Sequence, residues 1–203
     1  MTLTKEDVPE ILRYSGFRKG METGDVLDEK IDKAIETANL SAMPKTNWKL
    51  VDITENSDGI ELTGTDTVFK GKNIRNHLKN CTQAVLMCAT LGPKFDRKVK
   101  EIMLTDAAFG VLLNSAGVTL IEKVMDALQE EINEKLPEGH TGLRFSPGYG
   151  DFPLETQKDF MRLLNMERTV GIRLNEGLLM NPEKSVTAVS GIKYTYEAES
   201  YEE

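Results

Sequence analysis

Apolar residues recur at helical spacing along three stretches of the chain. The longest stripe runs from residue 109 to residue 132 and begins just after Asp106, which can cap a helix. A second stripe runs from 26 to 38, and a third follows Thr4, which opens a sequence resembling a capping box. We expect a short first helix ending near Gly16, an amphipathic helix ending before Pro44, and a long central helix from Asp106 to about residue 136.

Between these stripes the pattern changes to short alternating runs. They predict strands at 48–53, 59–62 and 67–69, and the turn sequence Asn56 to Gly59 predicts a hairpin between the first two. A continuous apolar run at 83–89 is typical of a buried strand, and 185–190 reads as a late strand. Further helices are expected at 73–79, from about Phe95, and at 153–164.

Together these elements predict an α+β fold. We expect an antiparallel or mixed sheet covered by helices, with one long central helix and an early hairpin meander. A boundary near Lys72 is conceivable, but no flexible stretch marks it, so we expect residues 1–203 to form a single domain. Gly20 punctuates the region after the first helix, and the acidic segment 197–203 is expected to be frayed.

Composition narrows the function classes. The 203 residues carry a formal net charge of −8, which repels phosphate backbones, so nucleic acid is not an expected partner. We find no apolar stretch of signal-peptide or membrane-span length, and we expect a cytoplasmic protein. Cys81 and Cys88 are expected to be reduced structural thiols. His77 and His140 lack the context of a metal motif, so no metal site is expected.

The most informative segment runs from Arg144 to Pro153. Arg144 presents a planar guanidinium that suits a carboxylate, and Gly148 and Gly150 allow positive φ and bring backbone amides close to a ligand. Tyr149, with its neighbours Phe145 and Phe152, presents ring faces for a heterocycle or a cation. The alternative is a simple Pro-Gly turn leading into the next helix.

Glu122 is the candidate acid to oppose Arg144. It stands in the predicted long helix between small or apolar side chains upstream and polar ones downstream, which include Asp126 and Glu130. Glu122 is either the first residue of a solvated stripe or a carboxylate that faces a crevice and pairs with a ligand ammonium or sulfonium.

No catalytic residues are expected. The sequence contains no Gly-x-Ser-x-Gly elbow, no dinucleotide-binding glycine motif and no P-loop. The remaining residues suit a ligand with one carboxylate, one or two positive charges and a flat ring. S-adenosylmethionine has these groups.

The sequence also resembles a known family. Arg144, Gly148, Tyr149 and Pro153 match the Arg-x-x-x-Gly-Tyr-x-x-x-Pro signature of the activation domain of cobalamin-dependent methionine synthase. The stretch from Leu91 through the predicted long helix is similar to the same family. The opening residues 10–14 resemble its free-standing members.

The resemblance implies a site for S-adenosylmethionine. In it Arg144 meets the methionyl carboxylate, Glu122 helps to hold the cationic end, and Ser146, Gly148 and Tyr149 line the adenosyl pocket. The C-terminal tyrosine of the family has no assigned equivalent in this chain. The candidates for it are Tyr194, Tyr196 and Tyr201. The N-terminal acidic contact of the family is likewise unassigned.

The resemblance also implies a role and partners. The chain would support reductive methylation of cobalamin carried by a partner methionine synthase or related corrinoid protein, acting in trans with a flavodoxin-like or other electron donor. Two alternatives stay open: a non-catalytic S-adenosylmethionine sensor or corrinoid-protein chaperone, and an interaction protein that has lost the ligand.

Overall fold

The computed structural model describes residues 1–18, 24–136 and 138–194 as an α+β fold built on one large sheet. Six strands lie in the order β3, β2, β1, β4, β8, β5, and each neighbouring pair is antiparallel. The expected fold class is confirmed, and the sheet is antiparallel. Its strands are β1 (Lys45–Glu55), β2 (Ile60–Leu62), β3 (Val68–Phe69), β4 (Gln83–Thr90), β5 (Gly139–Thr141) and β8 (Ser185–Tyr194).

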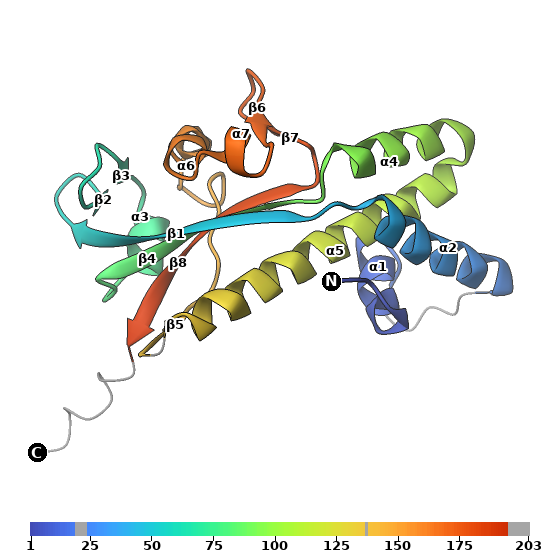
Figure 1. Cartoon of the computed structure of the whole chain (residues 1–203), viewed down its shortest axis with the longest axis horizontal. Coiled ribbons are helices and arrows are strands. Elements are labelled where there is room, and N and C mark those ends of the chain that lie inside the picture. Colours follow the sequence, from blue (N-terminus) through green and yellow to red (C-terminus); the bar gives the residue numbers. More distant parts are fainter. Residues whose placement is uncertain (19–23, 137, 195–203) are drawn as a thin grey trace, which may run out of the picture.

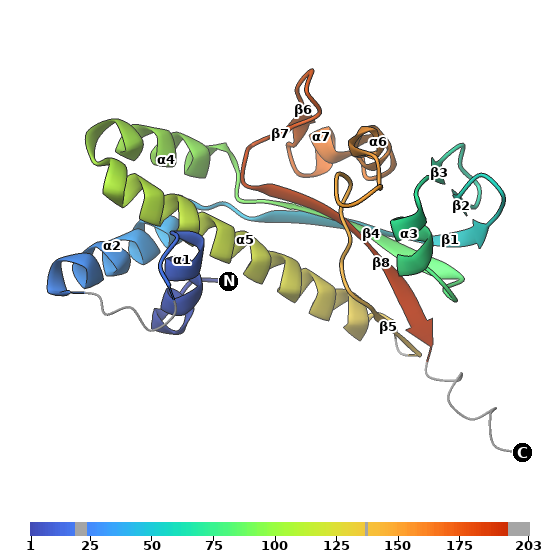
Figure 2. The ribbon, with the colours of Figure 1, turned by 180° about the vertical axis from the view of Figure 1, so that it is seen from behind.

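Helices cover both faces of this sheet (Figures 1 and 2). One layer holds η1 (Lys5–Asp7), α1 (Val8–Tyr14), α2 (Asp25–Ser41), α4 (Pro93–Thr105) and α5 (Ala107–Glu134). The other face carries α3 (Lys72–His77), η2 (Leu154–Thr156), α6 (Gln157–Leu163) and α7 (Met166–Thr169), beside a separate hairpin of β6 (Arg173–Leu174) and β7 (Met180–Asn181).

Strand β4 lies near the centre of the sheet and separates two hydrophobic cores. Its residues 85, 87 and 89 pack toward α5, whereas 84, 86 and 88 pack toward α3 and α6, as the two-residue period of a strand requires. Because both faces are covered, the strand reads as a continuous apolar run. Burial also raises the pKa of the Cys88 thiol to about 12, which fits an inert structural thiol.

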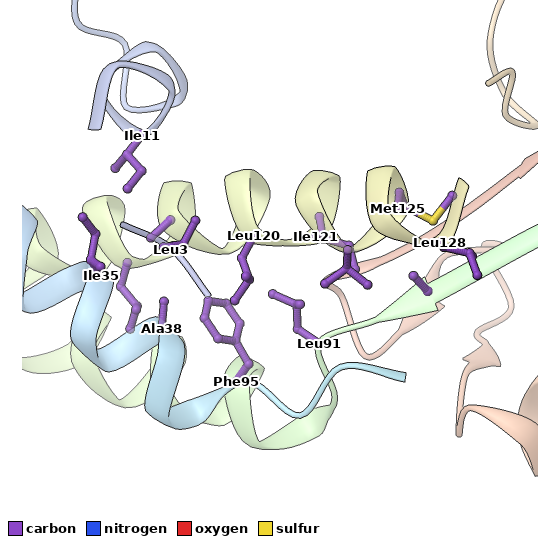
Figure 3. Packing of buried hydrophobic residues seen from close by; sticks show 14 of the residues in the cluster. Leu3, Ile11, Ile35, Ala38, Leu91, Phe95, Leu120, Ile121, Met125 and Leu128 are labelled. Carbon is purple, nitrogen blue, oxygen red and sulfur yellow. The ribbon is translucent and has the colours of Figure 1, made fainter. Parts of the chain in front are cut away.

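The long helix α5 is the backbone of the first core, and it begins where the sequence predicts. The Asp106 carboxylate accepts a hydrogen bond from the Phe109 amide, which caps the helix. Phe95 from α4 is fully buried beside Leu120 of α5 and Leu91 (Figure 3). With 28 residues and an apolar composition, α5 is long and apolar enough to cross a membrane. However, 67% of its most apolar 18-residue window is buried inside the protein, so α5 is a core helix.

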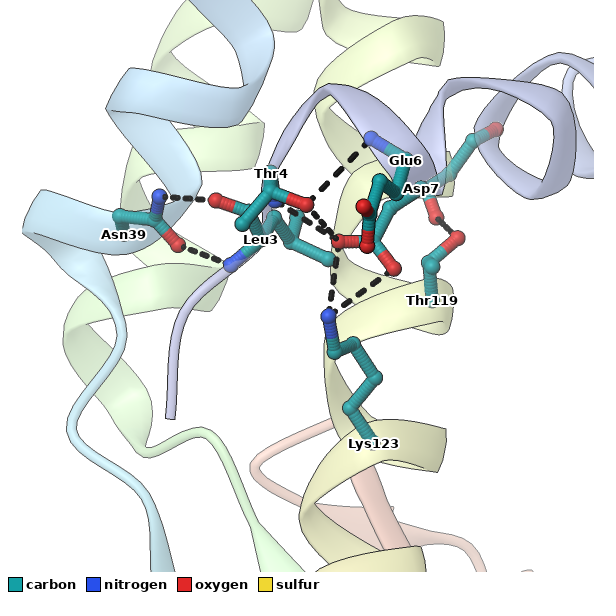
Figure 4. Close-up of polar contacts among 8 residues, drawn as sticks. Leu3, Thr4, Glu6, Asp7, Asn39, Thr119 and Lys123 are labelled. Atoms are coloured by element: carbon teal, nitrogen blue, oxygen red, sulfur yellow. Dashed lines mark hydrogen bonds and ion pairs between the residues drawn. The ribbon is translucent and has the colours of Figure 1, made fainter.

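The N-terminal segment is tied to α5 by polar contacts (Figure 4). The expected capping box is present: the Thr4 hydroxyl accepts from the Glu6 amide, and the Asp7 carboxylate accepts from the Thr4 amide. Asp7 also forms an ion pair at 2.8 Å with Lys123 of α5. The hydrogen bond to Lys123 lowers the pKa of Asp7 even though desolvation, the largest single influence, acts to raise it. This ion pair holds the N-terminal segment against α5 at Lys123, the residue that follows Glu122.

Some predicted boundaries differ from the structure. Val26, expected in the apolar stripe of α2, is 73% exposed. The helix expected at 153–164 begins as the 3-10 turn η2, and the short elements α7, β5, β6 and β7 were not predicted. The expectations for Gly20 and for 197–203 lie outside the described residues, and the single-domain assignment stays a prediction.

Gly117 provides a test of the packing of α5 against α4. A Cβ at this position would lie 2.4 Å from Cε1 of the buried Phe95 ring, so Gly117→Ala requires the ring or the helices around it to shift. Overpacking costs about 1–3 kcal/mol and outweighs the gain in helix propensity of about 1 kcal/mol. We expect a net loss in the free energy of unfolding, measured with denaturant. Val111→Ala, on an exposed part of the same helix, is the control and should change stability by less than about 0.5 kcal/mol. An unchanged or more stable Gly117→Ala variant would contradict this packing.

Candidate functional site

A pocket of about 540 Å³ lies between α5, the segment 142–149 and strand β8. This volume is within the range of small-molecule sites. The lining residues come from all three elements: Glu122, Asp126, Gln129, Gly142, Leu143, Arg144, Phe145, Ser146, Tyr149, Val186 and Ala188.

The polar wall of the pocket comes from one face of α5. Glu122, Asp126 and Gln129 are spaced by four and three residues, which places their side chains one above another on a helix. The Glu122 side chain is 44% exposed and that of Asp126 is 64% exposed. Glu122 thus lines the pocket with a side chain that is about half-exposed.

Arg144 bridges from the opposite wall to all three of these side chains. Its Nη2 donates to Glu122 Oε2 at 2.9 Å, and its Nη1 donates to Asp126 Oδ1 at 2.7 Å and to Gln129 Oε1 at 3.3 Å. Only 20% of the Arg144 side chain is exposed. The guanidinium thus holds two carboxylates, and the three charged lining residues leave the pocket with one net negative charge.

Backbone pairing fixes the segment that carries Arg144. Phe145 exchanges two N–H···O bonds with Val189 of β8, at 2.9 and 2.8 Å. Three residues earlier, the Gly142 carbonyl accepts from Gln129 Nε2 at 2.6 Å and from the Ser190 hydroxyl at 3.0 Å. Arg144 therefore lies between two anchored points, and its direction toward α5 is set by the sheet.

Strand β8 has an edge beside the pocket. In the register set by Val189 and Phe145, the N–H and C=O of Thr187 point away from β4 toward that edge. Val186 and Ala188, on either side of Thr187, line the pocket. The strand thus presents a backbone donor and a backbone acceptor at this side of the site.

The turn after Arg144 is compact. Gly148 has φ +93° and its amide donates to the Phe152 carbonyl, so this amide closes the turn and is not directed at a ligand. Gly150 has φ +57°, and a Cβ there would meet Asn73 Nδ2 at 2.3 Å. Both glycines are therefore required by local geometry, as the sequence predicted for their conformation.

The aromatic residues of the turn divide into two groups. Phe152 is 1% exposed and packs against Phe69 and Phe145, so it belongs to the second core and is not available to a ligand, contrary to the expectation from sequence. Tyr149 is 65% exposed and lines the pocket. Its exposed ring is therefore available for stacking at the pocket mouth.

The structure brings four of the five predicted site residues together. Glu122, Arg144, Ser146 and Tyr149 line the same pocket, whereas Gly148 shapes the turn behind it. Tyr194 lies in β8, where its hydroxyl contacts Gln83, and it is not a lining residue; positions 196 and 201 lie outside the described residues.

Two polar lining residues, Asp126 and Gln129, were not among the site residues predicted from the sequence. Their spacing from Glu122 was the available signal, since i, i+4 and i+7 share a helix face. Among the described residues, no group of three or more metal-ligating side chains occurs.

The fold and site define an α+β domain with a charged pocket between its long helix and its sheet. Residues 122–201 match the family model described as the vitamin B12 dependent methionine synthase activation domain. A crystal structure of the MetH reactivation domain bound to AdoHcy has the same fold, with a TM-score of 0.64 over 90% of this chain and 68% of that chain, at 17% sequence identity. No curated protein sequence matches the chain. The two matches confirm the resemblance to the activation domain of this family.

Asp151 provides a pH-dependent test of the turn. Its carboxylate accepts hydrogen bonds from the amides of Asn73 and Lys72 at the start of α3, and these bonds lower its pKa. The stabilisation is therefore fully present above the ordinary pKa of about 4 and is lost as the pH falls through the lower folded-state pKa. We expect Asp151→Asn to be less stable than the original protein at pH 7, with a difference that shrinks as the solution is made more acidic. Urea unfolding across this pH range measures it, and a difference independent of pH would contradict the assignment.

Proposed function

We propose that this chain binds S-adenosylmethionine in the pocket and supports reductive methylation of cobalamin carried by a partner methionine synthase or related corrinoid protein, acting in trans. The observation that carries the proposal is Arg144, a guanidinium that is only 20% exposed, held between Glu122 and Asp126 at a pocket with an exposed tyrosine ring. The AdoHcy bound to the MetH reactivation domain belongs to the same ligand class.

The charges of the pocket suit this ligand. S-adenosylmethionine carries a carboxylate, an ammonium and a sulfonium. Arg144 supplies the cation for the carboxylate, and Glu122 supplies an anion for the cationic end. Ion pairs inside a partly buried pocket are screened less than those in bulk water, so this complementarity fixes the orientation of the ligand.

The opposite side of the pocket suits an adenine ring. Adenine has a donor at N6 and an acceptor at N1, and the β8 edge presents a backbone acceptor and donor at Thr187. Tyr149 provides a ring for stacking, and Ser146 lies beside it on the pocket wall. These groups support the assignment of Ser146 and Tyr149 to the adenosyl end.

The proposed chemistry requires little acid–base machinery. The sulfonium is already activated for displacement, and the reduced cobalamin of the partner supplies the nucleophile. The residues of this chain bind and orient the donor so that its methyl group faces the docked partner. Such placement can supply several kcal/mol of a reaction barrier, on the order of 7 or more in the best cases. A flavodoxin-like or other electron donor completes the proposed system.

Arg144→Ala tests the proposed ligand contact. Removing a charge-assisted hydrogen bond costs about 1.5–3 kcal/mol, so the affinity for S-adenosylmethionine should fall about 10- to 150-fold, and the thermal stabilisation at a given ligand concentration should decrease. Isothermal titration and thermal unfolding with added ligand measure both effects. Arg162→Ala is the matched control, because Arg162 forms ion pairs with Asp66 and Asp159 away from the pocket. Binding that survives Arg144→Ala unchanged would contradict the proposed site.

A single-turnover assay tests the proposed role. The chain is mixed with a cobalamin-loaded methionine synthase fragment that lacks its activation domain, a reductant and S-adenosylmethionine. We expect the absorption spectrum of methylcobalamin to appear only when this chain is present. Binding without methylcobalamin formation would instead favour an S-adenosylmethionine sensor.

A further inference from the structure

Asp126 gives the pocket a second carboxylate next to Arg144. It lies one helical turn beyond Glu122 on the same face of α5, and its Oδ1 accepts from Arg144 Nη1 at 2.7 Å. One guanidinium therefore faces two carboxylates, and the lining carries one net negative charge.

The negative charge of the pocket matches the net charge of the methyl donor better than that of the product. S-adenosylmethionine has one net positive charge, whereas S-adenosylhomocysteine, which remains after methyl transfer, has a neutral sulfur and no net charge. The methyl donor thus neutralises the pocket, while the product leaves one carboxylate without a ligand cation.

We propose that Asp126 is a charge-selectivity residue that makes the pocket prefer the sulfonium ligand over its neutral product. This inference rests on the proposed function. When the ligand carboxylate binds Arg144, it displaces Glu122 and Asp126 from the guanidinium, and the two released acids face the two cations of the ligand. With the neutral product, Asp126 has no cation to meet and competes with the product carboxylate for Arg144.

Other acids near the pocket do not fill this role. Asp7 is paired with Lys123 on the neighbouring side of α5, and its side chain is only 14% exposed. Glu130 is exposed on the next turn of α5 and does not line the pocket. Asp126 is both in contact with Arg144 and 64% exposed, so its carboxylate is held loosely enough to change partner.

Asp126→Asn tests the proposal because it removes the charge and keeps the shape. Isothermal titration is carried out with S-adenosylmethionine, with S-adenosylhomocysteine, and with sinefungin, which carries an amine in place of the sulfonium methyl group. The affinity for the two cationic ligands should fall about three- to fivefold, as expected for an exposed ion pair, while the affinity for S-adenosylhomocysteine stays the same or rises. Added salt should reduce the preference of the original protein for the cationic ligands.

Glu130→Gln is the matched control, since it removes a charge from the same helix outside the pocket, and it should leave the preference unchanged. An equal loss of affinity for all three ligands, or no change for any, would overturn the role of Asp126 and leave the proposed function intact. Failure of the original protein to bind any of the three would overturn the proposed function itself.

Discussion

The site depends on the contact between Arg144 and the polar face of α5. A guanidinium with little exposure to water must keep partners of opposite charge, because an unpaired charge in such a place is costly. Glu122, Asp126 and Gln129 provide these partners, and they also join the segment 142–149 to the long helix. The same contact that stabilises the pocket therefore collects the charges that suit a zwitterionic ligand.

The geometry of this contact is fixed because α5 and the segment 142–149 are each held in place by other contacts. The face of α5 is fixed by the cap at Asp106, by the packing of Phe95 and by the ion pair between Asp7 and Lys123. The opposite side is fixed by the pairing of Phe145 with β8, a strand that is buried along most of its length. Binding groups held by such elements keep their geometry better than groups on free loops.

Apolar patterns along the chain and turn-forming residues explain which elements could be predicted from the sequence. The stripe of α5, the apolar run of β4 and the Asn56–Gly59 turn were each strong enough to predict their elements. The sequences of β5, β6 and β7 show no alternating apolar pattern. In the site, Arg144 and Tyr149 were identified by residue type, but the burial of Phe152 depends on packing against Phe69, which is distant in sequence. Asp126 resembled an ordinary solvated acid until its partner was known.

The resting arrangement also limits how ligands can bind. Arg144 is already satisfied by two carboxylates, so a ligand carboxylate gains only the difference between its own ion pair and those it replaces. A ligand that brings an anion alone would leave both acids unpaired, and a ligand that brings a cation alone would leave donors of Arg144 without an acceptor. Only a ligand that carries both charges at the right separation can replace the ion pairs of Arg144 with Glu122 and Asp126 by new ion pairs of its own. For the proposed ligand, the affinity would therefore follow from how completely its charges replace the contacts that it breaks.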